Sequence, residues 1–187
     1  MKIFLHICCA PCAIYPYFRL VEDGFEPQGY FYNPNIHPYQ EYRKRLDTAR
    51  DFSCRTGLEL EVQDGYDLDD FLRMTIGRGA GRCEQCYRMR LDKAARSARK
   101  QGFTLITTSL LYSKYQNHDL IRGVGEEMAA EQGLSFYYED FRRGWREGIV
   151  ESKAMGLYRQ QYCGCIFSEW ERYRVKTSIR EEAKTKG

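Results

Sequence analysis

Short apolar segments alternate with amphipathic segments along most of this chain. Those at 2–7, 27–32, 58–62, 104–111 and 135–138 have the length and composition of buried strands. Helical spacing predicts helices at 13–22, 39–56, 68–75, from Cys83 up to Gly102, from Asn117 up to Gly133, and near 145–155 and 167–173. This alternation predicts an α/β fold with a mostly parallel sheet and helices on both faces. Ligands of such sheets bind beyond the carboxyl ends of the strands.

Length and composition indicate one folded unit. We expect a single α/β domain over 1–175, followed by a charged tail at 176–187. Only five residues, Ile3 to Ile7, separate Lys2 from Cys8, which is too short for the apolar region of a signal peptide. No stretch approaches the ~20 apolar residues of a membrane span. We therefore expect a cytoplasmic protein without a membrane partner.

Seven of the eight cysteines fall in three tight groups, and Cys54 stands alone. In a reducing compartment, clustered cysteines are more often metal ligands or redox catalysts than structural disulfides. Thiolates from three distant parts of one chain are what a soft metal centre needs. Cys54 falls within a predicted helix, where we expect it to be buried as a small apolar residue.

The first cysteine group directly follows the first predicted strand and reads Cys8-Cys9-Ala10-Pro11-Cys12. A nucleotide-binding loop at this position is rich in glycine, because backbone amides must approach the phosphates. This loop has no glycine, and its proline lacks an amide hydrogen. It offers three sulfur atoms instead, which argues against ATP as a substrate and makes Cys12 a further candidate metal ligand.

The other two groups leave more than one role open. Cys83 and Cys86 open a predicted helix with a spacing that suits two ligands of one metal centre or a redox dithiol. Their distance from the first group is too long for a zinc ribbon. Cys163 and Cys165 flank a glycine and could cycle between dithiol and disulfide or supply further ligands.

Polar and aromatic residues follow the predicted strands on the same rim. Substrate contacts are predicted there for Tyr32, Asn33 and Ser109. His37 and Tyr112 follow two of these predicted strands near the same rim and are candidate proton donors, and Tyr32 is a third candidate for that role. Of the remaining histidines, His6 is expected in the core and His118 at a helix surface or in a binding contact.

Arginines surround the middle cysteine pair, among them Arg82 and Arg88, and the chain has 15 tyrosines. Arginine and exposed aromatic rings near a reactive centre suit an RNA substrate, since they hold phosphates and stack on unpaired bases. The net charge of only +3 does not by itself indicate nucleic-acid binding. The alternative for each of these residues is a solvated helix face or a core position.

Taken together, these residues resemble the epoxyqueuosine reductase family QueH. The resemblance spans most of the chain and rests on the segments Cys8-Cys9-Ala10-Pro11-Cys12, Tyr32-Asn33-Pro34-Asn35-Ile36-His37-Pro38, Cys83-Glu84-Gln85-Cys86-Tyr87-Arg88-Met89-Arg90, Thr107-Thr108-Ser109-Leu110-Leu111-Tyr112-Ser113-Lys114-Tyr115-Gln116 and Tyr162-Cys163-Gly164-Cys165. It implies an oxidoreductase that reduces epoxyqueuosine to queuosine at the wobble position of tRNA. It also implies a fold like that of the ATP-pyrophosphatase (HUP-like) group, with a cysteine-rich loop in place of the phosphate loop.

The resemblance further implies a [4Fe-4S] cluster, and members can hold a second, mononuclear iron. Its ligands would be Cys8, Cys9, Cys83 and Cys86, with Cys163 and Cys165 as a redox-active pair. The expected partners are tRNA with epoxyqueuosine in its anticodon loop and an external electron donor.

Three other classes of protein remain open from the residues alone. They are a zinc-stabilised RNA-binding module, an ATP-dependent tRNA thiolation enzyme, and a metal-free thiol peroxidase or disulfide reductase. Metal and acid-labile sulfide content separates them.

Overall fold

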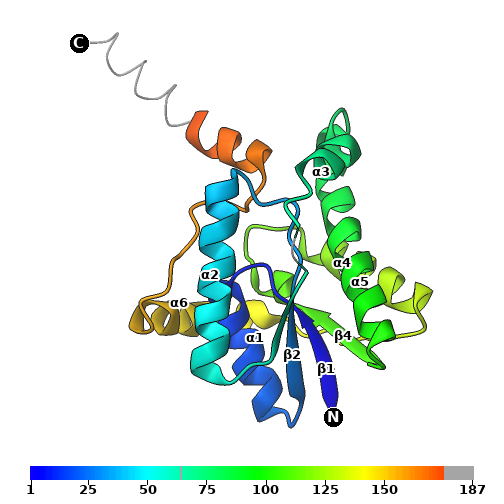
Figure 1. The fold of residues 1–187 in the computed structure, drawn as a ribbon, viewed down its shortest axis with the longest axis vertical. Coiled ribbons are helices and arrows are strands. Elements are labelled where there is room, and N and C mark those ends of the chain that lie inside the picture. Colours follow the sequence, from blue (N-terminus) through cyan, green and yellow to red (C-terminus); the bar gives the residue numbers. More distant parts are fainter. Residues whose placement is uncertain (64, 175–187) are drawn as a thin grey trace.

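A computed structural model describes residues 1–63 and 65–174 and has a five-stranded sheet at its centre (Figure 1). The strands are β1 (Lys2–His6), β2 (Glu26–Phe31), β3 (Leu60–Val62), β4 (Leu105–Thr108) and β5 (Ser135–Phe136). Their order is β3-β2-β1-β4-β5, and every neighbouring pair is parallel. The predicted parallel α/β sheet is confirmed.

Helices cover both faces of the sheet. Figure 1 shows α1 (Ala10–Glu22), α2 (Tyr39–Thr56) and α6 (Trp145–Ala154) on one side, and α4 (Arg82–Lys100) and α5 (His118–Glu131) on the other. The short helix α3 (Leu68–Thr75) packs on α4. Three 3-10 turns lie at Gly79–Gly81, Ser109–Tyr112 and Phe141–Gly144, and residues 166–174 are helical.

The core has two layers because both faces of the sheet are buried. Ile3 and Leu5 pack with the side chains of α1, while Phe4 points to the opposite face and packs with Ala94 and Ala98 of α4. This is why β1 reads as a continuous apolar run rather than as an alternating one.

The order of the strands creates a binding crevice at a defined place. From β1 the chain passes through α1 on one face to β2, whereas from β4 it passes through α5 on the other face to β5. The connections therefore diverge between the carboxyl ends of β1 and β4, where ligands bind in open α/β sheets. Cys8 and Ser109 lie at this point, and the backbone amide of Cys8 donates a 3.0 Å hydrogen bond to the Ser109 hydroxyl.

Several local predictions differ from the structure. The strand predicted over 104–111 ends at Thr108, because its hydroxyl accepts a hydrogen bond from the Leu110 amide and starts the turn Ser109–Tyr112. Buried residues continue through that turn, so hydrophobicity alone misplaces the strand end. The first helix begins at Ala10 rather than at residue 13, which brings Cys12 into its first turn.

Two predictions about single residues are wrong. Cys54 is exposed rather than buried, since it falls on the solvent face of α2. For His118 the helix-surface alternative is wrong, because the side chain is buried with its Nε2 3.2 Å from the Tyr138 hydroxyl, and the alternative of a binding contact stays a prediction. His6, in contrast, is a core residue as predicted, within hydrogen-bonding distance of Thr108 and the Tyr32 carbonyl.

The predicted tail at 176–187 lies outside the described residues, and the single domain over 1–175 stays a prediction. Among the helices at 1–63 and 65–174, none combines the length and the apolar character needed to cross a membrane.

Candidate active site

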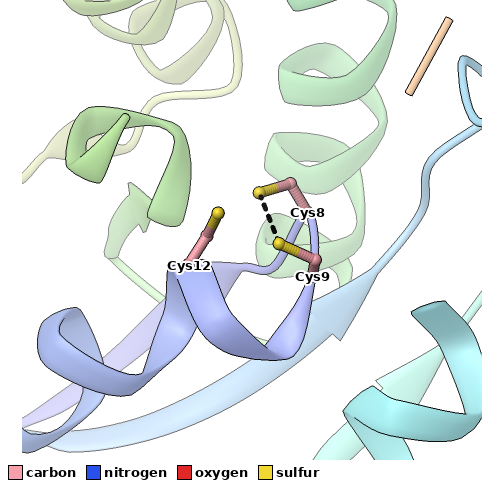
Figure 2. A group of neighbouring side chains, drawn as sticks. All are labelled: Cys8, Cys9 and Cys12. Carbon is pink, nitrogen blue, oxygen red and sulfur yellow. Dashed lines mark hydrogen bonds between the residues drawn. The ribbon is translucent and has the colours of Figure 1, made fainter. Parts of the chain in front are cut away.

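Three cysteine side chains, from the loop after β1 and the first turn of α1, point toward one another (Figure 2). The sulfur atoms of Cys8, Cys9 and Cys12 all lie within 4.8 Å of each other, and those of Cys8 and Cys9 are 3.8 Å apart. All three residues are buried and none forms a disulfide. Three converging thiols are a donor set for a soft metal ion or an iron–sulfur cluster.

The start of α1 explains this convergence. Cys9 precedes the helix in an extended conformation, with φ −170° and ψ 157°, and its carbonyl accepts a 3.2 Å hydrogen bond from the Ala13 amide. Cys12 follows one turn later and returns to the same side. Pro11 fits the first turn, where an amide hydrogen has no partner within the helix. The positive end of the helix dipole also favours thiolate at this place.

The electrostatics of the group single out Cys8 as the first thiolate. Hydrogen bonds from Cys12, Cys9 and Ser109 hold the pKa of the Cys8 thiol well below its ordinary value. Burial raises the pKa of Cys9, and hydrogen bonding to Cys8 raises that of Cys12. Because metal ligands must be deprotonated, Cys8 is the sulfur best prepared to bind first.

A cavity of about 620 Å³ opens beside the triad. Besides Cys8 and Cys12, its walls include Tyr112, Trp145 and Cys163. Tyr112 stacks on Trp145 at 5.1 Å between ring centroids and donates a 3.0 Å hydrogen bond to the Trp145 carbonyl. The volume falls in the range of small-molecule sites.

The segment 157–165, called the strap below, closes one side of this cavity. Figure 1 shows it (orange) running beside α2 from α6 toward the start of α2. Arg45 of α2 is buried and donates 3.0 Å hydrogen bonds to the carbonyls of Tyr162 and Cys163. Its Nε donates to Glu41 at 2.7 Å, and Glu41 also accepts a 2.5 Å hydrogen bond from Tyr158.

The loop after β2 holds the strap at its other end. The His37 amide donates to the Gly164 carbonyl at 2.8 Å, and the Tyr162 hydroxyl donates to the His37 carbonyl. The Ile166 amide donates to Nδ1 of His37 at 3.4 Å. His37 is thus buried beneath the Cys163-Gly164-Cys165 turn and does not line the cavity. Its predicted role as proton donor stays a prediction.

The middle cysteine pair lies apart from the triad. Cys83 and Cys86 occupy the first turns of α4, where Cys83 is exposed and Cys86 is buried. In the described part of the chain, neither sulfur belongs to the group within 4.8 Å. Arg90 of the same helix connects the two regions, since its guanidinium interacts electrostatically with Cys86, Cys163 and Cys8.

The predicted substrate residues divide into those near the triad and those elsewhere. Ser109 donates a 3.4 Å hydrogen bond to the Cys8 sulfur, and Asn33 donates one of 2.9 Å to the Ile7 carbonyl. The Tyr32 hydroxyl donates a 3.2 Å hydrogen bond to the Asp67 carboxylate. Arg82 pairs with Glu171, and Arg88 forms a two-pronged ion pair with Glu127. Both arginines therefore already have acidic partners, and their contacts with substrate stay predictions.

Sequence reasoning missed Arg45, and it identified Arg90 among the arginines around the middle cysteine pair without predicting that it is buried. Arg45 stands at helical spacing from Glu41 on a helix face that also carries Tyr42 and Leu46, and a charged pair on an apolar face is a signal of burial. Arg90, in the same way, shares the buried face of α4 with Tyr87, Leu91 and Ala94. The strap could not be placed, because nothing local in it forms a helix or strand.

The fold and this loop define a class of protein. It is a parallel α/β protein that carries three clustered cysteines, a candidate metal site, after its first strand, where nucleotide-binding proteins of this fold class carry phosphate-binding glycines. A family model described as "Epoxyqueuosine reductase QueH" matches residues 3–171. The chain belongs to this family, and the resemblance in sequence is confirmed.

Similar proteins cover nearly the whole chain. The epoxyqueuosine reductase QueH of Dehalococcoides mccartyi is 38% identical over 92% of this chain and 94% of its own length. That of Thermotoga maritima is 33% identical over 95% of both chains.

Two solved structures share the fold at low sequence identity. A "predicted subunit of tRNA methyltransferase" from Methanocaldococcus jannaschii has a TM-score of 0.55 at 9% identity over 82% of this chain and 74% of its own. The U34-tRNA thiolase NcsA from Methanococcus maripaludis, solved with its [4Fe-4S] cluster, has a TM-score of 0.52 at 12% identity. The match covers 97% of this chain and 67% of the thiolase chain. They confirm the expected fold.

Proposed function

We propose that this chain is an epoxyqueuosine reductase that acts on tRNA through an iron–sulfur centre. The observation that carries the proposal is the triad of buried thiols at the divergence point of the sheet, in a chain that belongs to the QueH family. The reaction removes the epoxide oxygen and leaves an alkene. It consumes two electrons and two protons and releases one water molecule.

The number and the chemistry of these thiols support a [4Fe-4S] cluster as the centre. Cys8 and Cys9 would supply two ligands from the loop after β1, and Cys83 and Cys86 two from the start of α4. Cys12 lies in the triad and could serve as a fifth thiol or as a ligand of a second, mononuclear iron. When bound, such a cluster supplies electrons one at a time.

Cys163 and Cys165 would serve as a redox-active pair. Both are free thiols, and Cys163 lines the cavity beside Cys8 and Cys12. Oxidation of the pair to a disulfide releases two electrons and two protons, which matches the demand of the reaction. An external electron donor would then restore the dithiol.

The cavity is suited to an unpaired nucleoside. Tyr115 is exposed and lines it together with Trp145, and these two rings meet edge to face at 5.6 Å. Lys114 lies over the Trp145 ring, with its amine 5.6 Å from the ring centroid. Aromatic side chains flanked by cations are the usual platform for unpaired bases of RNA.

Tyr112 is the proton donor that the geometry favours. Of the three predicted donors it is the one that lines the cavity, next to Cys8 and Cys12. Burial and the nearby thiols of Cys12 and Cys9 raise its pKa above the ordinary value. The phenol is therefore protonated at neutral pH, and its hydrogen, which is bonded to the Trp145 carbonyl, would have to turn toward the substrate to be donated.

The test is a pair of cysteine variants prepared without oxygen. Wild-type protein should contain iron and acid-labile sulfide and should convert epoxyqueuosine to queuosine in tRNA, as measured by mass analysis of its nucleosides. Cys8→Ser should lose both the cluster and at least 100-fold of the activity, because it removes the thiol that ionises first. Cys54→Ser, at an exposed position on α2, should match the wild type.

Other outcomes would contradict the proposal. A colourless protein with zinc and no sulfide would point to an RNA-binding module. Sulfur transfer that depends on ATP would point to a thiolation enzyme.

A further inference from the structure

Arg90 is a buried cation that lacks a carboxylate partner among the described residues. It is 1% exposed and is the largest side chain among the fully buried ones described. Its Nε donates a 3.1 Å hydrogen bond to the Cys86 carbonyl, and its guanidinium lies 5.6 Å from the centre of the Tyr87 ring. Its Nη2 is buried and has no hydrogen-bond partner within residues 1–63 and 65–174.

Arg45, in the same region, is a buried arginine whose positive charge is balanced by a carboxylate. It is 2% exposed, pairs with Glu41 at 2.7 Å, and directs its other nitrogen atoms to two carbonyls of the strap. A buried guanidinium with a carboxylate and full hydrogen bonding is a complete structural unit. Arg90 has no such complement, so its charge requires another anion.

The groups that act electrostatically on Arg90 are mainly thiols. Burial lowers the pKa of its guanidinium, but the thiols of Cys86, Cys163 and Cys8 raise it by more. These cysteines come from three separate parts of the chain, namely the start of α4, the strap and the loop after β1. Arg90 therefore interacts with cysteines from all three regions, and neutral thiols would leave its charge unbalanced.

We propose that Arg90 is the counter-ion of an anionic metal–thiolate centre that includes Cys8 and Cys86, and that its free Nη2 hydrogen donates to that centre. This inference rests on the iron–sulfur part of the proposed function. Arg90 is a positioning residue with an electrostatic role: its positive charge favours the more negative, reduced form of the centre. The charge and hydrogen bonding around a cluster are main determinants of its reduction potential.

The experiment is a redox titration of anaerobically reconstituted variants. Arg90→Gln should shift the reduction potential of the centre to a more negative value, because the positive charge is gone. Arg90→Lys keeps the charge and should restore most of the wild-type potential. Arg96→Gln is the matched control, since Arg96 lies exposed on the same helix and pairs with Asp92; it should leave the potential unchanged. A wild-type potential in Arg90→Gln would overturn the inference.

A second measurement applies even if Arg90→Gln binds no cluster. In metal-free, reduced protein, Arg90→Met replaces an unbalanced buried charge with an apolar chain of similar length. The metal-free variant should therefore melt at or above the wild-type temperature, whereas reconstitution should raise its melting temperature by less than it raises that of the wild type. Equal destabilisation of both forms would mean a purely structural role and would overturn the inference.

The two proposals fail in different ways. Wild-type protein without iron and sulfide would contradict the proposed function itself. Wild-type protein that holds both, with an unshifted potential in Arg90→Gln, would contradict the role of Arg90 alone.

Discussion

His37 joins two distant parts of the chain and is buried as a neutral imidazole. Its ring centroid lies 4.9 Å from that of Phe71 and 5.8 Å from that of Tyr66, and its Nε2 has no hydrogen-bond partner in the part of the chain that the structure describes. Burial lowers the pKa of His37 to about 4. The unfolded chain has a pKa of about 6.5 at this residue, so between these values the unfolded state binds more protons.

This shift predicts a pH dependence of stability. The contribution of His37 is fully present above pH ~6.5 and is lost as the pH falls toward 4, and its total is on the order of 3 kcal/mol. The free energy of unfolding of metal-free, reduced protein, measured in urea, should therefore fall between pH 7 and pH 4.5. His37→Gln should show a shallower fall. An identical slope in the variant would contradict the assignment.

For single residues, the sequence predicts the chemistry that a side chain can perform better than it predicts whether that side chain is buried. The spacing of Cys8, Cys9 and Cys12 identifies a sulfur-rich loop, and the structure brings their sulfurs together. Arginine, however, is usually a surface residue, so composition gave no reason to bury Arg45 or Arg90. Their burial depends on which faces of α2 and α4 meet the rest of the chain.

Helix α5 packs so closely on β5 that one position has no room for a methyl group. A Cβ at Gly125 would lie 2.4 Å from the Phe136 ring, whereas a Cβ at Gly123, on the exposed side of the same helix, would meet nothing within 4 Å. Packing therefore requires glycine at position 125 but not at position 123.

The two glycines form a matched pair for a stability test. Gly125→Ala should destabilise the protein by about 1–3 kcal/mol through overpacking, even though alanine favours a helix. Gly123→Ala should stabilise it by about 0.5–1 kcal/mol, because only the helix preference changes. Urea unfolding measures both values. Equal effects of the two substitutions would show that α5 does not contact β5 as described.

Element types were easier to predict than element ends. The long helix at 39–56 and the helix at 68–75 have the predicted bounds, since each carries a clear apolar face. The strand before Ser109 was predicted too long, because the turn after it is as apolar as the strand. The side-chain hydrogen bond of Thr108 that ends the strand is not visible in a hydropathy pattern.

For the whole molecule, the α/β alternation was enough to predict the parallel sheet and the rim where its ligands bind. It was not enough to predict how the chain closes that rim. The strap returns to the site through contacts with Arg45 and His37, residues more than 100 positions earlier in the chain. Such contacts between distant segments depend on the completed fold, and for that reason local patterns do not reveal them.

The central claim is that thiols after β1 hold iron in a closed α/β site. Diffraction from crystals grown without oxygen, with anomalous data at the iron absorption edge, tests it most directly. We predict iron bonded to the sulfur atoms of Cys8 and Cys9. Bare thiols at both residues, or anomalous signal at the zinc edge with none at the iron edge, would contradict the account.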